Sequence, residues 1–205
     1  MRLNAKEVDI NVLLDRYLPP GSQVLNNGSS DVRSGRRMVN LDVVPGANVD
    51  VVADAHDLPF DEGTFDGCVL SAVLQYCRNP FRVVSEAHRV LRNQGYVLVD
   101  VPFVQPYCPE RVAVDRFRVT HPGLVDMFNS HFDVVESGVS IAGGSAWALL
   151  CRSIADTCSR NRYVSAGLRL AVSALAWPIS RLRFGRRHEV ACALYLVGRK
   201  REPAP

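Results

Sequence analysis

Apolar and polar positions along the chain predict strands and helices in alternation. Short apolar runs bounded by Gly, Pro, Asn or Asp predict seven strands, at residues 22–27, 37–44, 49–55, 65–73, 96–103, 132–140 and 189–200. Apolar residues at helical spacing predict helices at residues 5–17, 80–95, 121–132 and 145–182. Strands that alternate with helices are typical of a parallel sheet with right-handed crossovers.

Proline, glycine and threonine mark several boundaries of these elements. A Pro-Pro-Gly sequence at residues 19–21 ends the first helix, Pro80 lies in the first turn of the second, and Thr120 caps the third. The run at residues 49–55 is apolar on both faces, which predicts a central strand of the sheet.

The elements together predict an α/β fold, namely a Rossmann-like, mostly parallel sheet of about seven strands flanked by helices. The last strand, 189–200, is expected to run antiparallel beside strand 132–140, after a helical insertion at residues 145–185. Because 205 residues suffice for one domain with a substantial core, we expect a single domain over residues 1–205, with its core at 20–140.

Composition excludes several classes of function. The chain is 47% hydrophobic and 22% charged with a net charge of +3, which is ordinary for a soluble globular protein and does not indicate nucleic-acid binding. Its six cysteines form no C-x-x-C pair and have no His at ligand spacing. We therefore expect no metal, no disulfides, and free thiols in a reducing cytoplasm.

Acidic residues stand at the ends of two neighbouring predicted strands. Asp42 lies near the end of strand 37–44, and Asp54 lies at the end of strand 49–55. Open α/β sheets hold their ligands at the carboxyl ends of parallel strands. The two carboxylates therefore predict a nucleoside-bearing cofactor at this edge of the sheet.

The longest informative stretch, residues 50–103, reads DVVADAHDLPFDEGTFDGCVLSAVLQYCRNPFRVVSEAHRVLRNQGYVLVDVPF. In order and spacing it resembles the class I S-adenosylmethionine-dependent methyltransferases, in particular the type 11 branch. The resemblance covers roughly residues 20–140. The segment DRFRVTHPGL (115–124) is also similar to one seen in members that are encoded near glycan-assembly genes.

The resemblance implies a cofactor, S-adenosylmethionine, and a role for each of several residues. Asp42 would accept hydrogen bonds from the ribose hydroxyls, and Asp54 would bind the adenine amino group. Gly28 would let the backbone approach the methionine part. The remaining implied contacts are the backbone N–H of Ala55, Ser71 at the exit of the fourth strand, and Asn26.

The first glycine motif departs from the family pattern. In the family, this motif is an acid followed by G-x-G-x-G, whereas this chain has NNGSSDVRSGRR. Asn26 stands in place of the acid, and Gly28 is the one glycine in register. Asp42 follows Gly28 by fourteen positions, against about 20 in Rossmann-type units. We therefore expect the first crossover helix to be short or missing.

No residue is assigned as the catalytic base. His121 is the candidate, although a histidine at the start of a helix is more commonly structural, because positive charge is disfavoured there. Tyr107 and His131 also follow the fifth strand. Asp115 and Arg118 either orient a sugar or pair with each other.

The segment LRLAVSALAWPISRLRFGRRH (168–188) has two interpretations. Its apolar residues followed by arginines predict either peripheral contact with anionic lipid through residues 164–188 or a helix packed on the sheet with solvated arginines. We favour the packed helix. With membrane contact, a lipid-linked glycan would be a fitting acceptor.

We interpret the chain as a methyltransferase acting on a small-molecule acceptor, for example a saccharide. The first alternative is a non-catalytic methyltransferase-fold scaffold or interaction module. A nicotinamide oxidoreductase fits worse, because the G-x-G-x-x-G loop it needs is absent.

Overall fold

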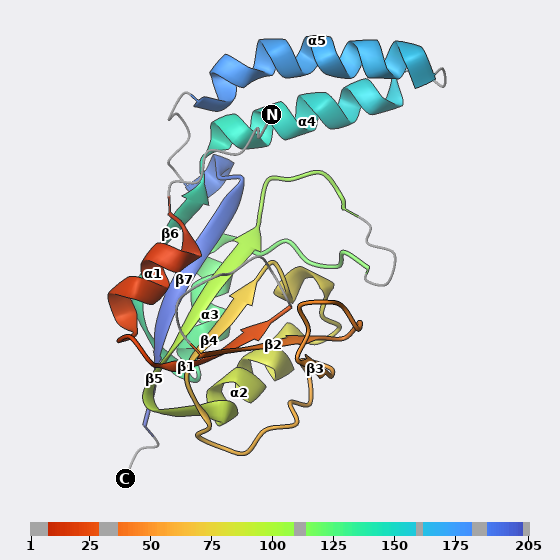
Figure 1. Ribbon diagram of the computed structural model, residues 1–205. Helices are drawn as coiled ribbons and strands as arrows, with labels where there is room; N and C mark the ends of the chain where they lie inside the picture. Colours follow the sequence, from red (N-terminus) through yellow and green to blue (C-terminus); the bar gives the residue numbers. More distant parts are fainter. Residues whose placement is uncertain (1–7, 29–36, 109–113, 159–161, 182–187, 203–205) are drawn as a thin grey trace.

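The computed structural model describes residues 8–28, 37–108, 114–158, 162–181 and 188–202 (Figure 1). Its strands are β1 (Gln23–Asn27), β2 (Arg37–Asp42), β3 (Val51–Val52), β4 (Phe65–Ser71), β5 (Leu91–Pro102), β6 (Phe132–Ile141) and β7 (Ala193–Lys200). Its helices are α1 (Ile10–Tyr17), α2 (Pro80–Val90), α3 (His121–Asn129), α4 (Gly143–Thr157) and α5 (Arg162–Arg181), with short 3₁₀ turns η1 (Leu74–Tyr76) and η2 (His188–Val190).

All seven strands form one sheet in the order β3-β2-β1-β4-β5-β7-β6. The strands from β3 to β5 pair in parallel, and β7 lies antiparallel between β5 and β6. This arrangement confirms the predicted Rossmann-like fold, including the antiparallel last strand. The edge of the sheet where β1 to β6 end is called the carboxyl rim below.

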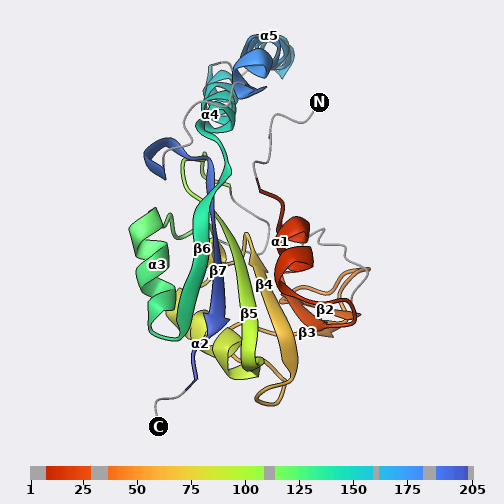
Figure 2. The ribbon, with the colours of Figure 1, turned by 90° about the vertical axis from the view of Figure 1, so that its left-hand side faces the viewer.

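Helices cover both faces of the sheet (Figure 2). On one face, Leu13 and Leu14 of α1 pack with Val69 and Leu98 of the central strands in a buried cluster. On the other, α2 and α3 pack in the larger cluster, to which Phe128 contributes. The core therefore lies on both sides of β1, β4 and β5, whose apolar runs are buried because each strand meets a helix layer on either face.

Two helix boundaries are set by local capping. The side chain of Asn79 accepts from the backbone N–H of Arg82 (3.1 Å) and Pro80 opens α2, while Thr120 accepts from Gly123 N (3.3 Å) and caps α3. The predicted first helix is described from Ile10 onward. The expectation of a short first crossover helix concerns residues 29–36, which lie outside the described residues.

The prediction that residues 49–55 form a central strand is wrong. Only Val51 and Val52 pair, at the edge of the sheet beyond β2, and Val52 is 56% exposed. An apolar run indicates strand preference but does not determine which strand acquires neighbours on both sides. Here β3 has a partner on one side alone.

The favoured prediction that the 168–188 segment packs on the sheet is also wrong. Residues 145–182 form two helices instead of one, and α5 packs along α4 in a hairpin that lies beyond the carboxyl rim (Figures 1 and 2). Arg169 Nε joins Asp156 Oδ1 across the hairpin at 3.1 Å. Among the described residues, no helix is long and apolar enough to cross a membrane.

A buried carboxylate on α2 holds the loop that follows β3. Glu86, 2% exposed, accepts from the backbone N–H of Leu58 (2.9 Å) and from the guanidinium of Arg89. Arg89 also donates to the carbonyl oxygens of Phe60 (2.7 Å) and Leu58 (2.8 Å). The hydrogen bond from Arg89 holds the pKa of Glu86 below its ordinary value, although burial opposes the shift. This clamp holds residues 58–60 against α2.

Ala72 adopts a backbone conformation that few residues other than glycine accept. Its φ is 55°, at the point where β4 leaves the sheet. The conformation is maintained by two hydrogen bonds, from Ala72 N to Asp100 O (2.8 Å) and from Gln75 Nε2 to Ala72 O (2.9 Å). A left-handed alanine costs about 1–2 kcal/mol, so the neighbouring structure must stabilise the turn.

Replacing Glu86 by Ala should lower the free energy of unfolding by about 2 kcal/mol at neutral pH, because Leu58 N loses its buried acceptor. Since the pKa of Glu86 is depressed in the folded state, its contribution is present above the ordinary value of 4.5 and is lost as the pH falls through the lower folded value. Urea unfolding of both proteins should therefore show a difference that shrinks below pH 4.5. Glu62→Ala, at an exposed position, is the control. An equal loss of unfolding free energy in this variant would contradict the stabilising role of Glu86.

Replacing Ala72 by Gly should leave the free energy of unfolding unchanged or raise it by up to about 1 kcal/mol, because glycine accepts a positive φ without strain. The matched control is Ala87→Gly in α2, which should lose about 1 kcal/mol or more. Urea unfolding of both variants makes the comparison. Equal losses at the two positions would show that Ala72 is unstrained.

Candidate functional site

The carboxyl end of β1 is built around Gly28. Its φ is +94°, and a Cβ added here would collide with Cγ2 of Val73, which follows β4. Its backbone N–H donates to Leu41 O at 2.7 Å. Only glycine fits a site with both a positive φ and so close a neighbour, so the backbone of β1 approaches the exit of β4 without a side chain between them.

Two buried asparagines precede Gly28. Asn26 is 0% exposed, and its amide nitrogen donates to Asn40 Oδ1 of β2 at 2.9 Å. Asn27 is 2% exposed, and among the described residues its amide Nδ2 has no hydrogen-bond acceptor. An unpaired buried donor costs about 1–3 kcal/mol. Such a donor at the end of β1 therefore suits a ligand that brings an acceptor.

Asp42 is the last residue of β2 and is half-buried. Its Oδ1 accepts from the backbone N–H of Val44 at 3.1 Å, which turns the chain after the strand. No described residue is hydrogen-bonded to Oδ2. One carboxylate oxygen thus has a local structural role, and the other can accept from a ligand.

Asp54 is held by His56. Its Oδ1 accepts from the backbone N–H (2.9 Å) and from ring Nδ1 (2.5 Å) of His56, while His56 Nε2 accepts from Asn79 N at 3.1 Å. Because Nε2 accepts, the ring proton lies on Nδ1 and points to Asp54. The backbone hydrogen bond from His56 is the main cause of the lowered pKa of Asp54. The carboxylate is therefore anionic and oriented at neutral pH.

The sheet brings the predicted residues into a row. Asp54 follows β3, Asp42 ends β2, Gly28 follows β1, and Ser71 ends β4, in the spatial order of those strands. Ala55 lies beside Asp54 and packs on the core. Since parallel neighbours end at the same edge, the row runs along the carboxyl rim.

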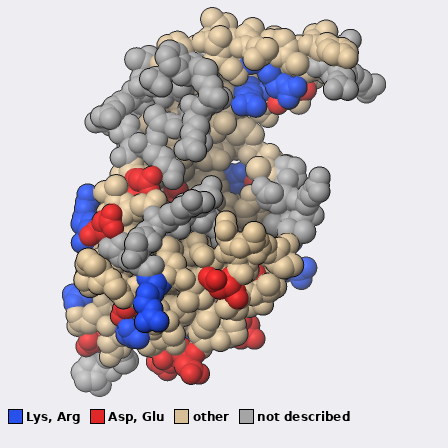
Figure 3. All heavy atoms as spheres, viewed as in Figure 1, with Lys and Arg blue, Asp and Glu red and all other residues tan. Residues whose placement is uncertain are grey.

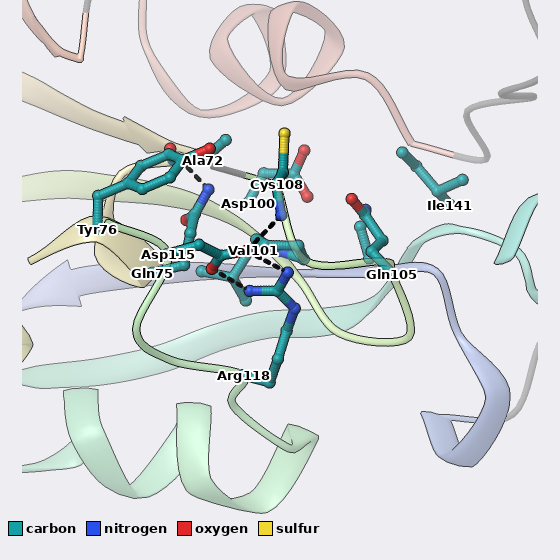
Figure 4. A pocket seen from close by; sticks show the side chains of 12 residues that line it. Ala72, Gln75, Tyr76, Asp100, Val101, Gln105, Cys108, Asp115, Arg118 and Ile141 are labelled. Atoms are coloured by element: carbon teal, nitrogen blue, oxygen red, sulfur yellow. Dashed lines mark hydrogen bonds and ion pairs between the residues drawn. The ribbon is translucent and has the colours of Figure 1, made fainter. Parts of the chain in front are cut away.

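A cavity of about 200 Å³ opens beyond the Ser71 end of this row (Figure 4). It is lined by residues that follow β4, end β5 or belong to the loop after β5, together with the end of β6 and the start of β7: Ala72, Gln75, Tyr76, Asp100, Val101, Pro102, Gln105, Cys108, Asp115, Arg118, Ile141 and Ala193. None of the residues predicted as cofactor contacts lines it. The cavity therefore adjoins the predicted row and does not coincide with it.

Two polar side chains give the cavity its chemistry. Gln75 is 5% exposed, and its Oε1 has no donor among the described residues. Asp100 accepts from the hydroxyl of Ser140 at 2.6 Å through Oδ1. Neither residue is among the candidates that the sequence pattern predicts. An acid at the end of an apolar strand, as with Asp42 and Asp54, was the signal that could have identified Asp100.

Asp115 and Arg118 pair with each other. The Asp115 side chain is 2% exposed and also accepts from Cys108 N at 3.1 Å, while Arg118 donates to Pro106 O at 3.2 Å. This ion pair is the main cause of the lowered pKa of Asp115. Of the two alternatives for these residues, mutual pairing is observed, and it holds the loop after β5 over the cavity.

His121 does not line the cavity. Its Nε2 lies 2.9 Å from Ser137 Oγ, and its ring stacks on His188 with centroids 3.7 Å apart. Burial is the main cause of its lowered pKa, so the ring is neutral at pH 7. Tyr107 is 63% exposed, and His131 precedes β6 at the opposite edge of the sheet.

The residues of the row fit an adenosine-bearing cofactor. Two carboxylates with an oxygen each open to a ligand, an unpaired buried amide at Asn27 and the glycine backbone lie along one rim. No cluster of His, Cys, Asp or Glu within the described part of the chain could hold a metal ion. The row and the cavity offer hydrogen-bonding groups and carboxylates to a ligand.

Comparisons with known proteins agree with this geometry. A type 11 family model described as "Methyltransferase domain" matches residues 31–99. The mitochondrial 2-methoxy-6-polyprenyl-1,4-benzoquinol methylase of Caenorhabditis elegans is 32% identical over 75 residues, which cover 37% of this chain and 26% of the relative. Matches to three further curated relatives likewise span about a quarter of each relative's length.

Solved structures share the fold across nearly the whole chain. The 1,6-didemethyltoxoflavin-N1-methyltransferase of Burkholderia thailandensis, solved with S-adenosylhomocysteine, is 17% identical with a TM-score of 0.56, over 94% of this chain and 76% of that one. The [4+2]-cyclase SpnF is 15% identical with a TM-score of 0.60, over 98% and 87%. The family match over residues 31–99 and the shared fold support a resemblance to the class I S-adenosylmethionine-dependent methyltransferases.

Proposed function

We propose that this chain transfers a methyl group from S-adenosylmethionine to a small polar acceptor held in the cavity between β4, β5 and β7. The observation that carries the proposal is that the unpaired, buried Oε1 of Gln75 and the Asp100 carboxylate belong to residues lining one cavity, which adjoins the row of predicted cofactor residues. When bound, the cofactor supplies an electrophilic methyl group. The chain supplies binding, alignment and a proton acceptor.

Each part of the cofactor is assigned to a different strand end along the row. Asp42 is assigned to the ribose hydroxyls, Asp54 and the Ala55 N–H to adenine, and Gly28 to the methionine part. The buried amide of Asn27 is suited to the methionine carboxylate, since its N–H groups have no described acceptor. Asn26, buried against Asn40, contributes to the shape of this end.

The order of the strands then directs the methyl-bearing end of the cofactor to the cavity. β1 lies between β2 and β4, so a ligand with its nucleoside over β2 and β3 extends across β1 toward β4. The lining of the cavity begins at Ala72, directly after Ser71. Methyl transfer is an in-line displacement whose rate depends on alignment, and this path brings the two reactants together at the end of β4.

The cavity selects an acceptor that donates hydrogen bonds. Gln75 Oε1 satisfies its hydrogen-bonding capacity only with an incoming donor, and Asp100, oriented by Ser140, can accept a proton from a hydroxyl or an ammonium group. A saccharide, free or linked to lipid, carries such hydroxyls. Asp100 therefore takes the general-base role for which His121 was the sequence-based candidate.

Binding of S-adenosylmethionine, measured by calorimetry, tests the cofactor assignment. Asp42→Ala should weaken binding by about tenfold or more, because a charge-assisted bond to the ribose contributes about 1.5–3 kcal/mol. Asp61→Ala, in an exposed loop, should bind as the wild type does. Undetectable binding by the wild-type protein would favour the non-catalytic scaffold.

Transfer of labelled methyl groups tests the acceptor cavity. With saccharide or polyprenyl-linked acceptors, Asp100→Asn should lower kcat by about 100-fold or more while the affinity for S-adenosylmethionine is retained. Gln75→Leu should raise KM for the acceptor. Tyr107→Phe, at an exposed position outside the cavity, should have no effect. If Asp100→Asn weakens cofactor binding instead, the cavity belongs to the cofactor.

A further inference from the structure

One side of α5 is exposed, and among its described side chains it carries no charge. Exposed residues recur at helical spacing along it, which defines an outer stripe: Tyr163, Val164, Gly167, Leu170, Ala171, Ala174, Leu175 and Pro178. Tyr163, Leu170 and Leu175 are 77%, 73% and 74% exposed. On α4, Trp147 and Ile154 are 52% and 61% exposed. The hairpin thus presents large apolar side chains where a surface helix normally has polar ones.

The less exposed side of α5 contains both polar and apolar residues. Ser165 is buried there, and Arg169 pairs with Asp156 of α4. Figure 3 shows the same arrangement, with an uncharged surface over α5 and charged residues below it on the hairpin. α5 thus leaves large apolar side chains exposed along its outer stripe, which favours an apolar phase or partner at this surface.

Positive charge flanks the stripe at both ends. Residues 157–188 contain seven arginines and no acidic residue, whereas the net charge of the whole chain is +3. Two of the arginines, at 160 and 162, precede the stripe, and four follow it, at 181, 183, 186 and 187. Arginines at the ends of an apolar helix face suit an anionic lipid surface.

We propose that the α4–α5 hairpin binds the surface of an anionic phospholipid membrane, with the outer stripe in the interface and the positive charge of the flanking sequence favouring anionic lipid. A second copy of the chain would also bury the stripe, but it would bring two arginine-rich segments together. Like charges repel at such an interface, so the charge distribution favours lipid.

The hairpin emerges from the wall of the cavity. α4 begins two residues after Ile141 and β7 begins at Ala193, and both of these residues line the cavity. A membrane bound by the hairpin therefore lies on the side of the carboxyl rim. On the proposed function, this position favours an acceptor presented at a membrane surface, such as a lipid-linked glycan.

Sedimentation with vesicles tests the proposal without cofactor or acceptor, so its outcome is independent of methyl transfer. The full chain should bind vesicles of phosphatidylcholine with phosphatidylglycerol, and should bind phosphatidylcholine alone at least about tenfold more weakly. Binding should weaken as salt is raised. Both tryptophans of the chain, Trp147 and Trp177, lie in the hairpin, so their emission should shift to shorter wavelength on binding.

Substitutions in the stripe separate the apolar contribution from the charge. Leu170→Gln with Leu175→Gln leaves the net charge unchanged and should lower binding to anionic vesicles at least about tenfold. Phe81→Gln, 62% exposed on α2, is the control and should bind normally. Circular dichroism confirms that each variant is folded.

Three results would overturn the proposal. The first is no binding of the wild-type protein to anionic vesicles, and the second is equal binding by the wild type and the double variant. The third is self-association in the absence of lipid that the double variant abolishes, which would assign the stripe to a second copy of this chain.

Discussion

The parallel pairing of β1 with both β2 and β4 is the constraint on which the site depends. Asn26 lies opposite Asn40 of β2 and Val69 of β4, so the three strands end at the same edge. Gly28 then brings the backbone against Val73, where a side chain would not fit. The row from Asp54 to Ser71 exists because of this register, and a shift of one strand would separate its members.

The fold alone does not determine the reaction. A methyltransferase and a [4+2]-cyclase both share it with this chain at similar TM-scores. On the proposed function, the reaction depends on the side chains at the ends of β4 and β5. In this chain they provide an unpaired amide oxygen on Gln75 and an oriented carboxylate on Asp100, beneath a loop fixed by the Asp115–Arg118 pair.

The hairpin and the cavity are connected through the same strands. β6 leads into α4, and α5 returns toward β7, so the insertion stands on the rim that carries the site (Figure 1). On the membrane proposal, the exposed apolar stripe of α5 and the arginines at its ends give a physical reason for the position of the insertion. On the two proposals together, a rim that faces a lipid surface would shorten the path of an amphiphilic acceptor to the cavity.

The sequence by itself determined the class of fold, the antiparallel last strand and the strand ends that carry Asp42 and Asp54. Those features depend on local periodicity, capping and turn residues, which act over a few positions. Tertiary structure alone decided that β3 lies at the edge, that His56 holds Asp54, and that Gln75 and Asp100 share a cavity. It also decided that α5 packs on α4 and turns its apolar side outward. Periodicity gives a helix an apolar face, but the partner of that face is set by contacts between residues far apart in the chain, which no local pattern encodes.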